Sequence, residues 1–95
     1  MPLATVVPIT VARKARANLA ERIDRLHVAA VGRLLALAMQ RAGGEAAPLV
    51  RRAVDARWWW EQRQMPGRIV VEWYEAALRV IEAEEHAVGL GSEGA

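Results

Sequence analysis

Residues 68–88, RIVVEWYEAALRVIEAEEHAV, carry the clearest periodicity in the chain. Apolar side chains recur there every three or four residues, which places them on one face of an α-helix. That face consists of Ile69, Val70, Trp73, Tyr74, Ala77, Val80, Ile81 and Val88. Polar side chains fill the other face, where Glu75 and Arg79 have the i,i+4 spacing of an ion pair. The segment is therefore predicted to be a surface helix that covers a core.

Two further helices are predicted before this one. The second helix is expected over residues 47–63 and opens with Pro48, whose fixed φ suits a first helical turn. The first helix is expected over residues 11–42 and stops at the pair Gly43-Gly44, because glycine commonly ends helices.

The start of the first helix has two readings. Thr10 can cap it, but the helix would then be about 45 Å long, which overhangs a compact domain of this size. Asn18, with Glu21 three residues later, resembles a capping box. We therefore favour a break near residue 18.

These segments predict an all-α fold in a single domain over residues 1–95. The expected architecture is a small bundle of three helices, or four if the first helix breaks. Pro2 and Pro8 block helix formation in residues 1–10, which are expected to form an extended arm. Residues 89–95 are glycine-rich and are expected to form a flexible tail.

The composition narrows the class of protein. Hydrophobic residues make up 54% of the chain, and the absence of cysteine excludes disulfides and thiolate metal sites. The most apolar stretch, residues 28–39, is too short to cross a membrane and contains Arg33. No secretory signal is recognised, so a cytoplasmic location is expected.

Charge is unevenly distributed along the chain. Residues 1–71 hold 12 Lys and Arg against 5 Asp and Glu, whereas residues 72–95 hold 1 against 6. A basic body of this kind suits contact with phosphate groups. An arginine-rich solvated surface from a GC-rich genome is the alternative explanation.

The first helix has more apolar surface than one core needs. Its main stripe is Leu19, Ile23, Leu26, Ala30, Leu34 and Leu37. A second stripe, Val28, Leu35 and Met39, lies to one side, and Gly32 is a small residue that lets another helix approach closely. Two readings stay open: these residues form an interface with other subunits or a second copy, or the helix is simply the centre of the bundle.

Three consecutive tryptophans on a helix point about 100° apart, so they cannot all enter one core. Trp60 is expected in the core and Trp58 at its edge, while Trp59 falls on the polar face. The predicted nucleic-acid site consists of Arg52, Trp59 and Arg63, with Arg51 at its margin. An exposed indole between guanidinium groups suits sequence-independent stacking on single-stranded nucleic acid. In the alternative, Trp59 packs under the arm or the tail, held by a cation–π contact with Arg63.

Catalytic and metal-binding groups are few. His27 lies within the apolar stripe and is expected to be a buried, hydrogen-bonded histidine rather than a general base. His86 follows Glu82 by four residues on the solvent side, without a second pair to complete a metal site. No phosphate-binding glycine loop occurs. We therefore expect no enzyme activity, no cofactor, no metal and no small-molecule substrate.

Residues 9–24, ITVARKARANLAERID, resemble the opening of Phd-type antitoxins. That family continues into strands with a basic-glycine turn, whereas this chain is expected to stay helical, so neither DNA binding nor toxin neutralisation is inferred. At the level of fold alone, a short, arginine-rich helical chain is similar to the small subunits of CRISPR effector complexes and to phage assembly proteins.

The favoured function is a non-catalytic subunit of a larger nucleoprotein assembly. Its arginines would contact nucleic-acid backbone, and its apolar helix faces would contact protein neighbours. The alternative is a helical adaptor or homo-oligomeric scaffold that binds protein only.

Overall fold

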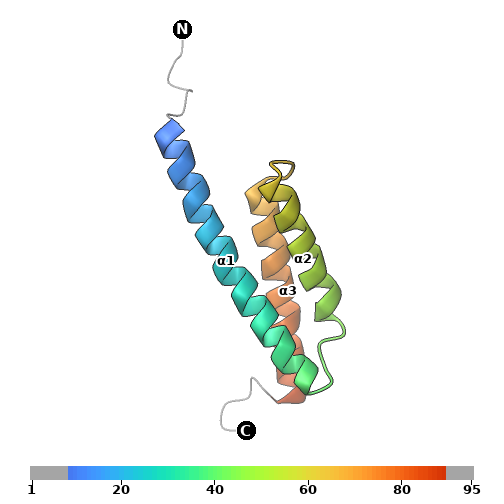
Figure 1. Ribbon diagram of the computed structural model, residues 1–95. Coiled ribbons are helices and arrows are strands. Elements are labelled where there is room, and N and C mark those ends of the chain that lie inside the picture. The colour runs from blue at the N-terminus through green and yellow to red at the C-terminus, as the bar shows by residue number, and fades with distance from the viewer. Residues whose placement is uncertain (1–8, 90–95) are drawn as a thin grey trace.

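The computed structural model describes residues 9–89, and within them it contains three helices and no strand. They are α1 (Ile9–Met39), α2 (Ala46–Glu61) and α3 (Gly67–Val88), which run alternately down and up in Figure 1. The predicted all-α fold is confirmed. None of these helices is long and apolar enough to cross a membrane.

The core lies where the three helices meet, and α3 supplies much of it. Tyr74 and Ile81 of α3 are fully buried together with Ile23 and Leu37 of α1. The α3 face is close to the predicted one, but Val71 is also buried, since α3 is flanked by both other helices. Its remaining core residues are Val70 and Ala77, and α2 contributes Ala46, Val50, Ala53, Ala56 and Trp60.

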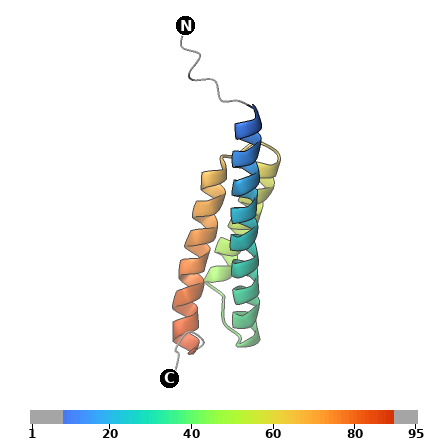
Figure 2. The same ribbon diagram turned by 90° about the vertical axis from the view of Figure 1, so that its left-hand side faces the viewer.

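The break predicted near residue 18 is wrong. α1 is one helix of 31 residues, and Asn18 lies exposed within it rather than at a cap. The prediction assumed a compact domain, whereas the first turns of α1 extend beyond α2 and α3 (Figures 1 and 2). The radius of gyration is accordingly 16.9 Å, against about 12 Å for a compact chain of this length.

The predicted extended arm also needs correction, because Ile9 and Thr10 are helical. The rest of the arm, residues 1–8, and most of the predicted tail, residues 90–95, lie outside the described residues.

Both α1 and α2 end through an arginine in the left-handed conformation. Arg41 has φ 58° and Arg63 has φ 60°. The Ala42 N–H then donates to the Leu37 carbonyl and the Gln64 N–H to the Trp59 carbonyl, both at 2.9 Å. These are the hydrogen bonds of a Schellman motif, in which glycine is the usual left-handed residue. α1 therefore ends at Met39, earlier than the glycine pair predicted.

Ion pairs tie α1 to the other helices. Arg22 contacts Glu75 of α3 at 3.2 Å, so the i,i+4 pairing predicted for Glu75 is replaced by one between helices. Further along, the Arg33 guanidinium makes two hydrogen bonds to the Glu85 carboxylate. α1 packs chiefly against α3 and less against α2, which leaves the side between α1 and α2 open.

Candidate interaction surfaces

The second apolar stripe of α1 lies in solvent. The exposed fractions are 70% for Val28, 62% for Leu35 and 84% for Met39. The reading in which these residues sit at the centre of the bundle is therefore wrong for the single chain. They point away from the core because the main stripe, with Ile23 and Leu37, already fills it.

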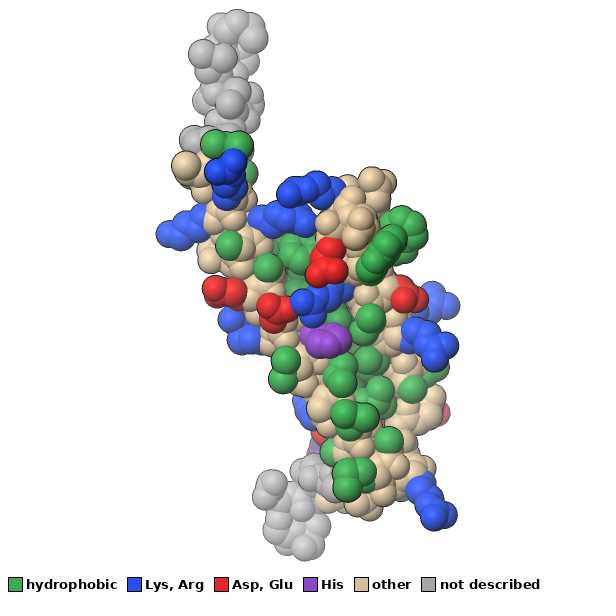
Figure 3. All heavy atoms as spheres, in the orientation of Figure 1, with side chains coloured by type: hydrophobic (Ala, Val, Ile, Leu, Met, Phe, Trp, Pro, Cys, Tyr) green, Lys and Arg blue, Asp and Glu red, His purple; other side chains and the backbone are tan. Residues whose placement is uncertain are grey.

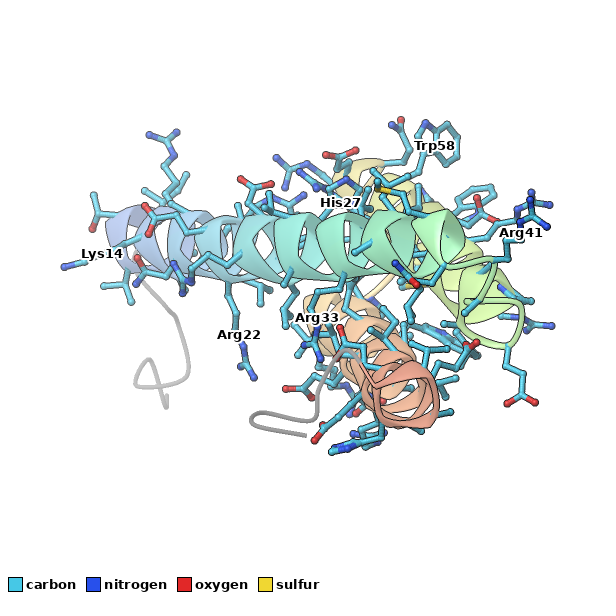
Figure 4. The ribbon with its side chains drawn as sticks, turned by 90° about the horizontal axis from the view of Figure 1, so that it is seen from below. Lys14, Arg22, His27, Arg33, Arg41 and Trp58 are labelled. Carbon is cyan, nitrogen blue, oxygen red and sulfur yellow. The ribbon has the colours of Figure 1, made fainter. Side chains whose placement is uncertain are left out.

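α2 adds two apolar side chains next to this stripe. Val54 and Trp58 are exposed, and the spacing of four residues places them on one side of α2. In Figure 4 the Trp58 indole stands out on the same side of the molecule as His27 of α1. Figure 3 shows hydrophobic atoms gathered over α1 and α2 on that side. We call the exposed set Val28, Leu35, Met39, Val54 and Trp58 the α1–α2 face.

One ion pair joins the two helices beside the apolar part of this face. Arg57 of α2 forms an ion pair with Asp24 of α1 and lies 3.6 Å from Glu61. The Arg57–Asp24 pair links the two helices, whose relative position is set by the core that they share. The α1–α2 face is therefore a formed surface of the folded chain.

His27 is hydrogen-bonded as predicted, although it is half-buried rather than buried. Its Nδ1 lies 2.8 Å from the Tyr74 hydroxyl, and the rings meet edge to face with centroids 5.8 Å apart. Burial raises the pKa of Tyr74 above its usual 10.0, although the nearby Arg57 opposes the shift. The phenol is thus protonated at neutral pH and joins α1 to α3 as a structural contact.

The predicted nucleic-acid site is partly assembled. Trp59 is 47% exposed and lies in a shallow hollow of about 160 Å³ together with Arg52, Asp55 and Trp73. The Arg52 guanidinium stands 5.5 Å from the centre of the Trp73 ring. Trp59 itself meets Trp58 edge to face at 4.8 Å. In the part of the chain described, the cation–π pairs are those of Arg16 and Arg52, so the Trp59–Arg63 contact of the alternative reading does not form.

The other two arginines do not line this hollow. Arg51 lines a broader, open depression of about 610 Å³ with Arg52 and Asp55. Arg63 is exposed on the turn after α2. The Asp55 carboxylate sits on the same stretch of helix as both Arg51 and Arg52 and reduces the attraction of the site for phosphate.

One contact that sequence reasoning missed holds the long α1 in place. The Arg16 guanidinium stacks 4.3 Å from the centre of the Trp60 ring and donates to the Trp60 carbonyl at 3.0 Å. Leu19 packs nearby against Gly67, where an added Cβ would clash at 2.1 Å. Arg16 and Trp60 are 44 residues apart in the sequence. No local pattern in the sequence relates the two residues, so their contact could not be predicted.

The titratable groups offer no assembled metal site among the described residues. No three His, Cys, Asp or Glu side chains gather there, and His86 is exposed near the end of α3. Comparisons of the chain with protein-family models, with curated proteins and with solved structures found no match.

Proposed function

We propose that the protein is a non-catalytic helical subunit that binds another protein chain through the α1–α2 face. The observation that supports this most is the exposure of Val28, Leu35 and Met39 along one side of α1. Single exposed apolar side chains are ordinary, whereas a contiguous set beside a second exposed set on α2 is typical of an interaction surface. A cytoplasmic location belongs to the same proposal and rests on the cysteine-free sequence.

The energetics favour a covered face. Burying a Val or Leu side chain is worth about 1.5–3 kcal/mol relative to leaving it exposed. Trp58 is about half exposed, and tryptophan is among the residues that contribute most at protein interfaces. A partner that covers these side chains therefore gains free energy without any change in the fold of this chain.

Photo-cross-linking in the cells that make the protein tests the proposal. A photoreactive phenylalanine analogue replaces Leu35, and a matched control carries it at Arg79, which is exposed on α3. We expect discrete cross-linked protein bands from position 35 and none from position 79. Equal labelling at both positions, or none at either, would contradict the proposal.

A second candidate function is contact with nucleic-acid backbone, as a subunit of a nucleoprotein assembly. Two observations support it: the Trp59 indole is available for stacking, and the Arg52 guanidinium lies in the same hollow. Asp55 works against it, and two or three arginines neutralise few phosphates. Binding by one chain is therefore expected to be weak, and useful binding would require several chains in one assembly.

The test for this second function is binding of fluorescent single-stranded RNA and DNA across a salt series. Trp59→Ala should weaken binding by about 1–3 kcal/mol, the worth of one base–aromatic stack. The double variant Arg52→Ala/Arg63→Ala should reduce the salt slope, because fewer counterions are released. If neither the chain nor its native complex binds at low salt, a protein-only adaptor or scaffold is the better account.

A further inference from the structure

The first turns of α1 project beyond the other two helices. The Arg16 guanidinium donates to the Trp60 carbonyl at 3.0 Å, and Leu19 lies against Gly67, so the neighbouring ends of α2 and α3 meet α1 at this level. Residues 9–15 come before it, are all exposed and span about 9 Å of helix. Figures 1 and 2 show them clear of the rest of the bundle. We call residues 9–15 the α1 projection.

Positive charge collects at this end of the molecule. Residues 9–20 and 62–71 hold five Lys and Arg and no Asp or Glu. The five are Arg13, Lys14, Arg16, Arg63 and Arg68, and within residues 9–89 none of them forms an ion pair. Figure 3 shows Lys and Arg side chains around the first turns of α1, and Figure 4 shows Lys14 at the far end of that helix. A polyanion would neutralise these like charges.

Most of the carboxylates next to this end are already neutralised. Arg57 pairs with Asp24 and lies 3.6 Å from Glu61, and Arg22 pairs with Glu75. The exposed carboxylates that border the basic end are Glu21 and Glu72, and both lie further into the bundle than the α1 projection. The excess of positive charge therefore increases towards the start of α1.

A group of carboxylates lies at the opposite end of the bundle. Glu84 contacts the loop after α1, and Glu85 pairs with Arg33 near the end of α1. With Glu45 and Glu82, which are exposed, they make this end acidic. Charge is thus divided along the length of the molecule, so a polyanion is attracted to the first turns of α1 and repelled from the other end.

The shape of the α1 projection favours a groove between two strands of phosphate. Arg13 and Lys14 point about 100° apart, so positive charge faces more than one side of the helix. Ala12 and Ala15 lie between and beside them and keep the helix slim. A helix about 10–12 Å across fits the major groove of B-form DNA, which is about 12 Å wide and has a phosphate backbone on each side.

An anionic membrane suits this segment less well. A helix that lies in a membrane surface carries its basic residues on one side and a broad apolar face on the other. The large apolar residues of the α1 projection are Ile9 and Val11, and two successive turns beyond them contribute only alanines. The observations therefore favour nucleic acid over lipid.

We propose that the α1 projection binds double-stranded DNA by entering the major groove, where Arg13 and Lys14 contact backbone phosphates on its two sides. Arg63 and Arg68, at the adjoining ends of α2 and α3, add phosphate contacts outside the groove. This inference goes beyond the proposed function, since the α1–α2 face lies further along α1 and binds protein. It also differs from the Trp59 hollow, which suits a single strand.

Binding to a fluorescent DNA duplex of random sequence across a salt series tests the proposal. Four phosphate contacts predict a dissociation constant of about 1–100 µM and a slope of about −4 for log affinity against log salt. Arg13→Ala/Lys14→Ala should reduce the slope to about −2 and keep the helix, because alanine is a strong helix former. Arg16 is left intact, since it fastens α1 to Trp60.

The matched control removes two positive charges elsewhere. Arg41→Gly/Arg79→Ala is suitable because both residues are exposed outside the basic end and the φ of 58° at Arg41 suits glycine. Its slope should stay near −4, and Trp59→Ala should bind the duplex as the wild type does. Equal losses in the two double variants would trace binding to net charge alone and overturn the proposal.

Two other ligands test the groove itself. An RNA duplex carries the same phosphates, but its deep, narrow major groove excludes a helix, so binding should be at least about fivefold weaker than to DNA. Equal affinity for both duplexes would overturn entry into the groove. Tighter binding to vesicles with about one quarter phosphatidylserine would assign the basic end to lipid instead. No binding to the DNA duplex at low salt would also overturn the proposal, while cross-linking at position 35 tests the α1–α2 face independently.

Discussion

Glu84 belongs to α3, but its carboxylate satisfies the N-terminus of α2. It accepts hydrogen bonds from the backbone N–H groups of Gly43 at 2.7 Å and Ala46 at 2.9 Å. The residue in the N-cap position of α2, Glu45, makes no such bond with its own side chain. An anion at this position also interacts favourably with the helix dipole.

Replacing Glu84 with alanine should lower the free energy of unfolding by about 1–2 kcal/mol, because two backbone donors lose their acceptor. Urea denaturation measures this. Glu82→Ala, an exposed neighbour on α3, is the control and should change the free energy by less than about 0.5 kcal/mol. Equal losses in the two variants would show that the cap contributes nothing specific.

The Arg33–Glu85 pair makes stability depend on pH. Hydrogen bonds from Arg33 lower the pKa of Glu85 below its usual 4.5, although burial opposes the shift. A carboxyl whose pKa is lower in the folded state stabilises the fold above its unfolded pKa. That contribution is lost as the pH falls through the lowered value.

The wild type should therefore exceed Glu85→Gln in stability at pH 7, and the difference should shrink as the pH falls from about 4.5 towards 3. Because the Arg33 side chain is 41% exposed, solvent screens the pair, and a difference of about 1 kcal/mol or less is expected. Urea denaturation at several pH values measures it. A difference that stays constant down to pH 3 would contradict the assignment.

At the scale of elements, periodicity in the sequence was enough to predict the three helices and the residues of α1 that face the core. The same pattern singled out Val28, Leu35 and Met39, but it could not decide between an interface and a bundle centre, since that depends on how many helices surround α1. The unbroken course of α1 was not predictable either. The sequence shows a local capping signal at Asn18, which favours a break. It does not show the contact of Arg16 with Trp60, because the two residues are far apart in the chain.

The predicted nucleic-acid site around Trp59 was also only partly predictable from the sequence. The exposure of Trp59 followed from its place on the helix, but the stacking of Arg52 on Trp73 depends on α3, which packs beside α2. The position of a residue in a helix fixes the direction of its side chain around that helix axis. Its contacts with other helices depend on how the helix axes pack against one another.

Arg16→Ala should loosen the start of α1, because the contact with Trp60 helps to fasten it to the end of α2. Hydrogen exchange of the backbone amides in residues 9–19 should become about tenfold faster, as expected for losing roughly 1–2 kcal/mol of cation–π and hydrogen-bond energy. Arg13→Ala, an exposed residue of the same helix, is the control and should change little. Unchanged exchange in Arg16→Ala would show that the contact with Trp60 does not stabilise the start of α1.

At the scale of the whole molecule, three helices close around one core and leave one side uncovered. α1 is longer than its partners and packs chiefly on α3, so the α1–α2 face has no fourth helix within residues 9–89. The chain is thus a folded unit that presents an apolar surface of fixed shape. That arrangement suits a subunit whose role is association.

Oxidation of two methionines tests most directly whether the α1–α2 face is bare on one chain and covered in the working assembly. Met39 lies on the face and is 84% exposed, whereas Met65 is half-buried against the core and serves as the internal control. In the dilute purified chain, hydrogen peroxide should oxidise Met39 several-fold faster than Met65, in proportion to exposure. In the native complex isolated from the cells that make the protein, mass spectrometry should find Met39 oxidised no faster than Met65. A Met39 that keeps its lead in that complex would contradict the account.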